Sequence, residues 1–390
     1  MESIMSQWIE CTLNDIGEIV GGSTPLTAKK EYYGGEIPWI TPKDLSSHQN
    51  RYIAKGERNI TKAGLNSCSA TLLPKNTILF TSRAPIGYVA ISSTELCTNQ
   101  GFKSIIPKEE VDNLFVYYLL VYNRNKIISM GSGTTFKEVS GKVMKSIEVK
   151  IPQTFRHQKK IASILGRIDD KIELNNKIND NLQQQAATLF ANFYEQAETE
   201  VGFTELVQIL GGGTPKTGEK SYWNGKVLFF TPKDIGFPYT LSTEKTITEE
   251  GLAHCNSRLY PVNTVFVTAR GTVGKIGMPG VPMAMNQSCY ALIGKNTNQI
   301  LVYFYTLKVV DRLKYKASGA VFDAITTRDF ETESIFKLSD AHAEAFLNIA
   351  RPIYRAILGN TFENQQLTAL RDFLLPKLIS GELDVSELAI

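Results

Sequence analysis

Residues 20–44 read VGGSTPLTAKKEYYGGEIPWITPKD, and residues 210–234 read LGGGTPKTGEKSYWNGKVLFFTPKD. The two stretches align at a constant offset of 190 without a gap. Their identities fall on Gly, Thr, Pro and Lys-Asp positions, and Gly, Pro and Asp are residues that turns favour. A match of this length predicts that the chain contains one structural unit twice.

A second block repeats at an offset of 187. Residues 74–87, PKNTILFTSRAPIG, match residues 261–274, PVNTVFVTARGTVG, and the pair Asn99-Gln100 matches Asn286-Gln287. The change in offset from 190 to 187 lies between Asp44 and Gly64, opposite Asp234 to Gly251. We therefore expect a loop there whose length differs between the two copies.

Each copy reads as an α+β domain. Short Val, Ile and Phe runs, such as 77–81 and 264–268, lie between Gly, Pro and Asn residues and predict strands. Aromatic-rich amphipathic segments at 114–128 and 301–313 predict helices. A period near 190 is too long for a solenoid, whose units have about 20 to 50 residues. Each copy is therefore predicted to be a domain of about 150 residues with an appendage.

The appendage follows the heptad pattern of a coiled coil. Its seam alternates spacings of four and three residues and contains no proline: Ile161, Leu165, Ile168, Ile172, Asn175, Asn179, Leu182, Ala186, Leu189 and Phe193. Adding 185 to each number gives a second seam from Phe346 to Leu378, with asparagines again at Asn360 and Asn364. The chain therefore carries two helices with matched seams.

Two seams of equal length in one chain are expected to bury each other, because an exposed apolar stripe favours aggregation. Antiparallel pairing with partner numbers that sum to 539 sets Asn175 against Asn364 and Asn179 against Asn360. Buried Asn pairs lower stability but fix the register. The alternative is that each helix packs on its own domain. Pro352 favours it, because a proline should kink the second helix or begin it there.

Together these patterns predict an α+β chain in which two tandem-repeated globular domains are separated by two long helices. The helices form an antiparallel coiled coil, and the whole has pseudo-two-fold symmetry. The expected boundaries are domains at 1–150 and 199–336, and spacer helices at 151–198 and 337–390. The coil from Ile161 to Phe193 would be about 50 Å long, compared with about 34–36 Å between DNA half-sites one helical turn apart. Such a rod could hold two DNA-reading domains at a set spacing.

The C-terminal residues 370–383, LRDFLLPKLISGEL, resemble the terminal signature of the specificity subunit of type I restriction-modification systems. The blocks at 22–44 and 212–234, and RGTVG at 270–274, resemble blocks that the target recognition domains of this family share. The resemblance covers essentially the whole chain, in the order domain, helix, domain, helix. Two features depart from it: RAPIG at 83–87, and a first helix that ends in TLFANFY rather than in LLPK.

This resemblance implies a DNA-reading subunit without catalytic activity. Each target recognition domain would recognise one half of an asymmetric bipartite site in double-stranded DNA, and the helices would bind two modification subunits. Those partners would carry S-adenosylmethionine and methylate adenine. Restriction subunits would join for translocation and cleavage that use ATP and Mg. The chain itself would need no cofactor.

Composition limits the other classes of function. The chain has 390 residues with 42 basic and 39 acidic side chains, and the net charge of +3 does not by itself indicate a nucleic-acid binder. Five scattered cysteines indicate a reducing compartment and no zinc site. The longest apolar run, 114–122, is far shorter than the roughly 20 residues that span a bilayer. No secretion signal is evident at the N-terminus, so we expect a cytoplasmic protein.

Catalytic motifs do not fit. Residues 213–221, GTPKTGEKS, approach a phosphate-binding loop, but Glu219 separates the second glycine from the lysine that would reach the phosphates. The first copy has Ala28 where the second has Gly218. No Asn/Asp-Pro-Pro-aromatic string of an amino-methyltransferase occurs. An enzyme remains an alternative that a methyl-transfer assay on the isolated chain would test.

DNA contacts are expected from loop residues, most of which occupy equivalent positions in the two copies. Loop cations suit phosphate contacts, and the Asn-Gln pairs could read adenine. The candidates are Thr41, Lys43, Arg83, Asn99, Gln100, Thr134, Lys137, Thr231, Lys233, Arg270, Lys275, Asn286 and Gln287. The alternative is that Lys43-Asp44 and Lys233-Asp234 form local caps and that the two arginines are structural.

Base specificity is expected where the copies diverge, since a feature common to both domains cannot explain two different half-sites. The divergent segments are 46–62 and 236–250, with the loops 132–137 and 318–323. The competing class of function is a scaffold, in which the coil joins two protein-binding domains.

Overall fold

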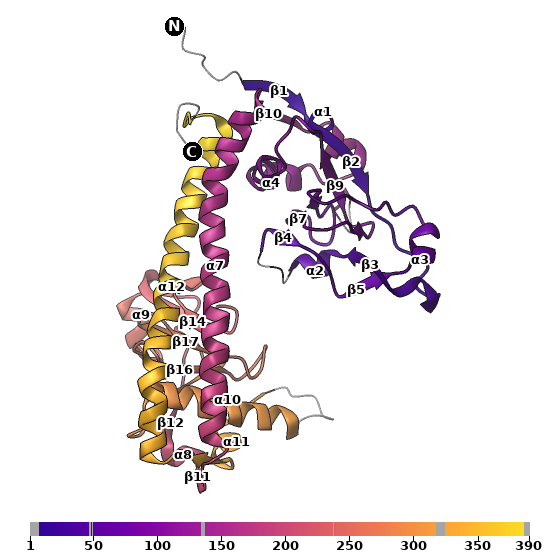
Figure 1. Cartoon of the computed structure of the whole chain (residues 1–390). Helices are drawn as coiled ribbons and strands as arrows, with labels where there is room; N and C mark the ends of the chain where they lie inside the picture. The colour runs from indigo at the N-terminus through magenta and orange to yellow at the C-terminus, as the bar shows by residue number, and fades with distance from the viewer. Residues whose placement is uncertain are drawn as a thin grey trace. The chain divides into compact units, whose positions relative to one another are not determined.

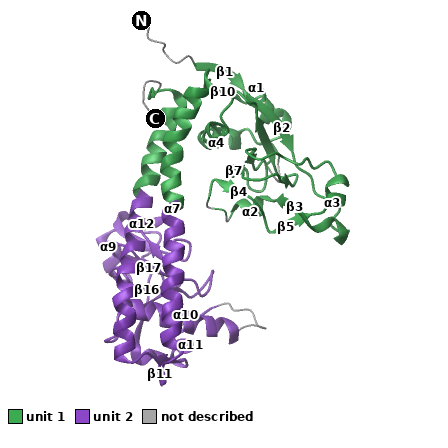
Figure 2. Ribbon diagram, in the orientation of Figure 1, with its two compact units in different colours: residues 1–173, 366–390 green, residues 174–365 purple. Residues whose placement is uncertain are grey.

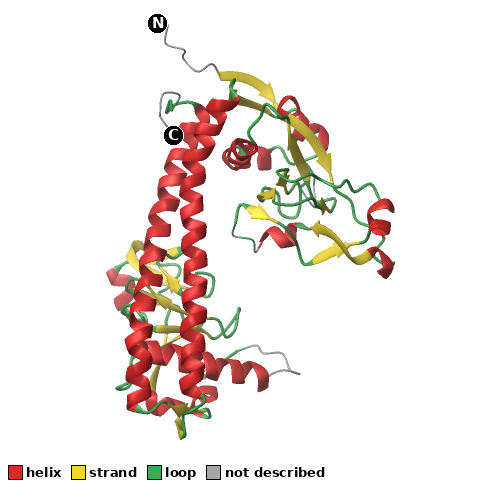
Figure 3. Cartoon of the chain, in the orientation of Figure 1, coloured by secondary structure: helices red, strands yellow, loops and turns green. Residues whose placement is uncertain are grey.

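The computed structural model describes residues 8–385 except 47, 49, 134–136, 237 and 317–323. It divides into two compact units (Figure 2): unit 1 comprises residues 1–173 with 366–390, and unit 2 comprises residues 174–365. The two long helices, α7 (Phe155–Tyr194) and α12 (Asp340–Ser380), each contribute one part to either unit. Both units mix helices and strands (Figure 3).

The globular part of unit 1 contains one five-stranded, one three-stranded and one two-stranded sheet in its described residues. The five-stranded sheet has the order β2 (Gly17–Gly21), β9 (Lys103–Pro107), β6 (Ile78–Phe80), β7 (Val89–Ser92) and β4 (Tyr52–Ile53). The three-stranded sheet has the order β5 (Arg58–Ile60), β3 (Tyr33–Ile40) and β8 (Cys97–Thr98). The remaining pair joins β1 (Trp8–Thr12) to β10 (Glu148–Pro152).

Unit 2 repeats this topology strand for strand. Its five-stranded sheet has the order β12 (Val207–Gly211), β19 (Cys289–Gly294), β16 (Val265–Thr268), β17 (Ile276–Pro279) and β14 (Tyr239–Thr240). The smaller sheets have the orders β15 (Lys245–Ile247), β13 (Trp223–Phe230), β18 (Met283–Met285), and β11 (Thr199–Gly202), β20 (Ser334–Lys337). The predicted tandem α+β fold is therefore confirmed.

The helices of the two units correspond, with two differences: α2 has no helical counterpart at residues 232–236, and one helix of unit 2 is broken into two in unit 1. Unit 1 has α1 (Leu13–Ile16), α2 (Pro42–Ser46), α3 (Lys62–Asn66), α4 (Asn113–Tyr122), α5 (Arg124–Ser129) and α6 (Gly141–Lys145). Unit 2 has α8 (Phe203–Leu206), α9 (Glu249–Ala253), α10 (Gln299–Lys316) and α11 (Thr327–Glu331). The predicted helix at 301–313 is the single α10. Its counterpart at 114–128 is broken at Asn123, whose side chain donates to the Leu119 carbonyl oxygen at 2.8 Å.

Threonine caps place the short helices alike in both copies. The Thr61 hydroxyl accepts from the Gly64 backbone N–H at the start of α3, and the Thr248 hydroxyl accepts from Gly251 at the start of α9, each at 3.0 Å. Such N-caps satisfy a backbone donor that the helix itself leaves free. The same local sequence therefore builds the same local structure twice.

The core of each unit joins the domain to both long helices. In unit 1, Phe80 and Phe115 of the domain share one buried cluster with Leu165 of α7 and Leu378 of α12. In unit 2 the corresponding cluster joins the α10 helix to both long helices through Phe304, Phe190 and Phe346. Full burial of one Phe or Leu side chain contributes about 1.5–3 kcal/mol, so each cluster is a substantial attachment. Packing on the domain and packing between the helices therefore occur together, and the two sequence alternatives do not exclude each other.

The two long helices run antiparallel where they meet inside each unit (Figure 1). In unit 2 the Asn175 side chain donates to Asn364 Oδ1 at 2.9 Å, and the Asn360 side chain donates to Asn179 Oδ1 at 2.8 Å. These are the pairs whose numbers sum to 539. Asn175 is only 1% exposed, so the pairs lie inside the seam.

The expectation for Pro352 was wrong in one respect, because α12 does not begin there. The helix begins at Asp340, where the Ser339 hydroxyl accepts from the His342 backbone N–H at 3.2 Å. A proline at 352 has no backbone N–H, so the carbonyl of Asn348 loses its helical hydrogen bond. Both Pro352 and Asn348 are exposed. Water can satisfy that carbonyl, and the helix therefore continues to Ser380.

In the described part of the chain, no helix is long and apolar enough to cross a membrane.

Candidate nucleic-acid interface

In each unit, the ends of a parallel strand pair bring two of the repeated motifs together. Strands β3 and β8 are parallel, with Ile40 beside Thr98, so the loops that begin at Thr41 and Asn99 leave side by side. The Asn99 backbone N–H donates to the Ile40 carbonyl at 3.0 Å. In unit 2, the backbone N–H of Asn286 donates to the Phe230 carbonyl at 2.9 Å. The Thr-Pro-Lys-Asp and Asn-Gln motifs are therefore neighbours in both copies.

The Gly-Gly loop completes this arrangement. The Ser23 backbone N–H donates to the Thr98 carbonyl at 3.0 Å, and a Cβ atom at Gly22 would overlap the carbonyl oxygen of Asn99. The Thr24 hydroxyl hydrogen-bonds to Gln100 Oε1. Unit 2 has the same contacts, with Gly212 against Asn286 and a hydrogen bond from Thr214 to Gln287. The close approach requires glycine, because any side chain would displace the Asn-Gln loop.

The Thr-Pro-Lys-Asp turns are local caps, as the alternative interpretation expected for the aspartates. The Thr41 backbone N–H and hydroxyl both donate to Asp44 Oδ2, at 2.7 and 2.6 Å, and Asp44 Oδ1 accepts from the Glu57 backbone N–H at 2.7 Å. Thr231, Asp234 and Glu244 repeat the same three distances in unit 2. Thr41 and Thr231 therefore shape their turns through Asp44 and Asp234.

The lysines of these turns point to solvent. Lys43 is 79% exposed and forms an ion pair with Glu57 at 2.8 Å. Lys233 is also exposed. A surface ion pair of this kind contributes little to stability, so a DNA phosphate could replace Glu57 as the partner of Lys43.

The arginines lie beside the Asn-Gln loop but differ in their surroundings. Ser82, next to Arg83, donates its backbone N–H to the Gly101 carbonyl at 2.7 Å. Arg83 then meets Glu138 at 3.6 Å, and Lys103 meets the same carboxylate at 3.6 Å. In unit 2, Ala269 makes the equivalent backbone bond to Ser288, also at 2.7 Å.

Arg270 is exposed, and the residue opposite it in the corresponding bridge is Ala324 rather than a glutamate. The second copy therefore presents an arginine at a position where the first copy pairs its arginine with a carboxylate. This difference between the copies was not predicted.

The asparagines are engaged in local turns. Asn99 Oδ1 accepts from the Gly101 backbone N–H at 2.9 Å, and Asn286 Oδ1 accepts from Ser288 at 3.0 Å. Each turn therefore uses one of the two lone pairs of the side-chain oxygen, and a bidentate bond to adenine would use the other lone pair together with the side-chain NH₂ group. Gln100 and Gln287 are exposed at the surface of the loop.

The remaining candidates lie nearby or outside the described residues. Lys137 and Lys275 are exposed, and Lys275 follows the Arg270 loop directly. Thr134 and the loop 318–323 lie outside the described residues. The Asp44–Glu57 contact of unit 1 corresponds to the Asp234–Glu244 contact of unit 2. The difference in loop length therefore lies between these contacts, in residues 45–56 of unit 1 and 235–243 of unit 2.

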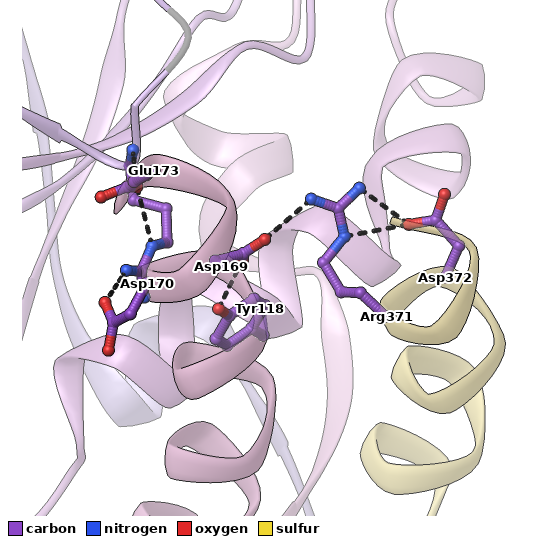
Figure 4. A network of polar contacts seen from close by, with 7 residues as sticks. Tyr118, Asp169, Asp170, Glu173, Arg371 and Asp372 are labelled. Atoms are coloured by element: carbon purple, nitrogen blue, oxygen red, sulfur yellow. Dashed lines mark hydrogen bonds and ion pairs between the residues drawn. The ribbon is translucent and has the colours of Figure 1, made fainter. Parts of the chain in front are cut away.

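Sequence reasoning missed a polar network on α7 in unit 1 (Figure 4). Asp169, only 5% exposed, accepts from the Tyr118 hydroxyl at 2.6 Å and forms an ion pair with Arg371 at 2.9 Å. Arg51 meets Asp170 and Glu173 of the same helix. One signal was available, since Arg371 is a charged residue at a seam position of the second heptad pattern.

The described residues contain no group of three or more His, Cys, Asp or Glu side chains that could hold a metal ion. Burial raises the pKa of the Cys97 thiol in unit 1 and of the Cys289 thiol in unit 2 to about 12, so both stay protonated. These two cysteines pack in the core and are not thiolate ligands or nucleophiles.

Comparisons with known proteins agree with the duplicated architecture. The sequence model of a family described as type I restriction modification DNA specificity domain matches residues 5–184 and 199–336. The MjaIX specificity subunit of a type I restriction enzyme from Methanocaldococcus jannaschii is 32% identical over 416 residues, which cover 99% of this chain and 95% of the relative. The HindI specificity subunit from Haemophilus influenzae is 23% identical and covers 97% of this chain and 100% of the relative.

A solved structure has a similar fold. The S subunit of a type I restriction-modification system from M. genitalium superposes with a TM-score of 0.62 at 16% sequence identity, over 99% of both chains. With the family model matching both copies, the chain belongs to the type I restriction-modification DNA specificity family, as a specificity subunit rather than an enzyme.

Proposed function

We propose that this subunit reads an asymmetric bipartite site in double-stranded DNA. Residues 1–150 and 199–336 would act as two target recognition domains, one for each half-site. Residues 151–198 and 337–390 would supply the helices that set the spacer. The modification subunits, two in number, would dock on these helices.

One observation carries this proposal: the same loop cluster is built twice. In each unit the Gly-Gly loop, the Thr-Pro-Lys-Asp turn and the Asn-Gln loop meet through equivalent hydrogen bonds, and exposed lysines lie around them. Equivalent loop clusters suit contacts that occur in both half-sites, such as contacts to phosphates. The chain segments that differ between the copies adjoin these loop clusters and are suited to read different bases.

The long helices support the spacer role. At 1.5 Å per residue, the 40 residues of α7 extend about 60 Å, which is enough to serve two half-sites at least one DNA turn apart. The Asn175–Asn364 and Asn179–Asn360 pairs favour a single register. A fixed register is what a constant spacer requires, because a slip by one heptad would move one recognition domain relative to the DNA.

Catalysis would then belong to the partners. The relatives are named specificity subunits of type I restriction enzymes. S-adenosylmethionine would be bound by the modification subunits, and ATP and Mg by the restriction subunits. This chain would supply the choice of sequence.

Salt-dependent DNA binding tests the proposal against a scaffold that binds only proteins. The chain is assembled with its modification subunits, and the dissociation constant for a duplex is measured between about 50 and 200 mM salt. A DNA reader that neutralises several phosphates loses affinity steeply over this range. The logarithm of its association constant falls linearly with the logarithm of the salt concentration. The same measurement on the modification subunits alone is the control. If adding this chain changed neither the affinity nor the slope, the proposal would be wrong.

A further inference from the structure

The segment in which the copies differ in length carries a buried arginine in unit 1. Arg51 lies within residues 45–56, directly before β4, and is only 4% exposed. Its carbonyl accepts from the Ile91 backbone N–H at 2.8 Å, which fixes the backbone against β7. A buried arginine needs partners for its charge, since an unpaired buried charge is strongly destabilising.

The partners of Arg51 lie on one turn of α7. Both the backbone N–H and Nε of Arg51 donate to Glu173 Oε1, at 2.9 and 3.1 Å. The Nη2 atom forms an ion pair with Asp170. Burial alone would lower the pKa of the Arg51 guanidinium, but Tyr118 and the carboxylates of Glu173 and Asp170 raise it above its usual value. Arg51 is therefore a permanent cation in this contact.

The same turn of α7 also joins two other elements (Figure 4). Asp169 accepts from Tyr118 of α4, and Arg371 of α12 reaches Asp169 at 2.9 Å and Asp372 at 2.9 Å. Residues 169–173 of α7 thus connect the divergent segment, helix α4 and helix α12. Charge-assisted hydrogen bonds of this kind are directional, so they define an orientation as well as an attachment.

Unit 2 attaches its domain differently. The backbone N–H of Met278 donates to the Pro238 carbonyl at 2.7 Å, which makes Pro238 the counterpart of Arg51. At the offset of 185 between the two long helices, Tyr354 is the counterpart of Asp169. The Tyr354 ring packs against Tyr239 and Tyr303 at ring-centroid distances of 6.4 and 5.7 Å. The fold can therefore form without the ionic contact, and among the described residues the Arg51 network belongs to the first copy.

We propose that Arg51 is a positioning residue that holds the recognition domain of unit 1 in one orientation on α7. By this contact it restricts the spacer lengths that the subunit accepts between its half-sites. Buried ion pairs contribute little net stability, whereas a bidentate contact from a loop to a helix restricts rotation. The inference rests on the proposed function, because spacer length has a meaning only for a bipartite DNA reader.

The test compares spacer discrimination in the complete complex with the modification subunits. Methylation mapping first defines the site of the unaltered protein. Duplexes with the native spacer, and with one base pair more or fewer, are then methylated by the unaltered protein and by the R51M, E173Q and R124M variants. Arg124 is an exposed arginine at the start of α5 in the same domain, outside the divergent segment 46–62, and is the matched control. A charge-exchange pair, R51E alone and R51E with E173R, tests the contact itself.

We expect R51M to lower the preference for the native spacer by at least tenfold and E173Q to lower it less, while the half-site sequences stay the same. R124M should keep the native preference. R51E should lose the preference, and adding E173R should restore part of it. Asp170 is largely exposed and Glu173 partly so, which means that R51M leaves no fully buried carboxylate unpaired.

Two results would overturn the inference. One is an R51M complex that melts at a lower temperature but keeps the full spacer preference, since this describes a purely structural residue. The other is a loss of preference in R51E that E173R does not restore. Failure of the proposed function is distinguishable, because then the unaltered complex itself would show no bipartite site.

Discussion

At the scale of single residues, the candidate interface depends on glycines that permit close backbone contact. Gly22 and Gly212 lie so close to the carbonyl oxygens of Asn99 and Asn286 that a Cβ atom would overlap them. Neither glycine has a positive φ. The constraint is therefore space, and the neighbour is backbone that cannot move without moving the loop.

A substitution tests this constraint. We expect Gly22→Ala to lower the free energy of unfolding by about 1–3 kcal/mol, because it forces an extra atom into a closed contact. Gly218→Ala is the control, since its Cβ would meet no atom within 4 Å. Urea denaturation of the two variants measures the difference. Equal effects of the two substitutions would contradict the packing argument.

The two arginines make a second prediction at this scale. Arg270 is exposed opposite Ala324, whereas Arg83 shares Glu138 with Lys103. We therefore expect Arg270→Ala to weaken DNA binding and to reduce the salt slope by about 1, the value for one lost phosphate contact. Arg83→Ala should have a smaller effect on both quantities. Binding isotherms at several salt concentrations measure this, and a larger effect from Arg83→Ala would show that Glu138 does not mask the first arginine.

At the scale of elements, the seam between α7 and α12 combines apolar contacts with asparagine pairs. Asn179 and Asn360 form one pair inside unit 2, and Asn179 is 7% exposed. A buried amide that loses its partner keeps its desolvation cost, which is about 1–3 kcal/mol. The pair therefore stabilises one register mainly by penalising the others.

A double-mutant cycle measures this coupling. We expect Asn360→Leu alone to destabilise the chain by about 1–3 kcal/mol, because Asn179 loses its hydrogen-bond partner. The double variant N179L/N360L should be more stable than the sum of the single effects predicts, since two leucines can pack on each other. Thermal unfolding of the three variants tests this. Additive effects would mean that the two asparagines act independently.

The divergent segment of unit 1 makes an element-scale prediction about sequence reading. Replacing residues 46–62 by the segment of a relative that reads a different half-site, with Arg51 retained, should change one half-site and leave the other intact. Retaining Arg51 separates base reading from the attachment to α7. Methylation mapping after the exchange provides the result. If both half-sites changed, or neither did, base reading would not reside in this segment.

At the scale of the whole molecule, the sequence predicted the parts that depend on repetition and periodicity. The duplication, the strands at 78–80 and 265–268, and the two long helices follow from patterns that local chemistry enforces. The Asn pairs follow from the same heptads. Of the two effects expected at Pro352, a kink or a helix start, the start was wrong, because exposure of that turn to water removes the penalty that a buried proline would carry.

The candidate interface was less predictable. The equivalent loops were recognisable from the repeat, but the capping of Thr41 by Asp44 and the pairing of Arg83 with Glu138 depend on tertiary contacts. The attachment of Arg51 to Asp170 and Glu173 joins residues about 120 positions apart in the chain. No periodicity connects such residues, and their pairing becomes visible only in the folded unit.

The most direct test of the central claim is methylation mapping of DNA from a host that carries this subunit with its cognate modification subunit. The account predicts one asymmetric motif with two specific parts and a nonspecific spacer of constant length, which disappears when this chain is deleted. A continuous motif without a spacer, a spacer of variable length, or a motif that persists without this chain would contradict the account.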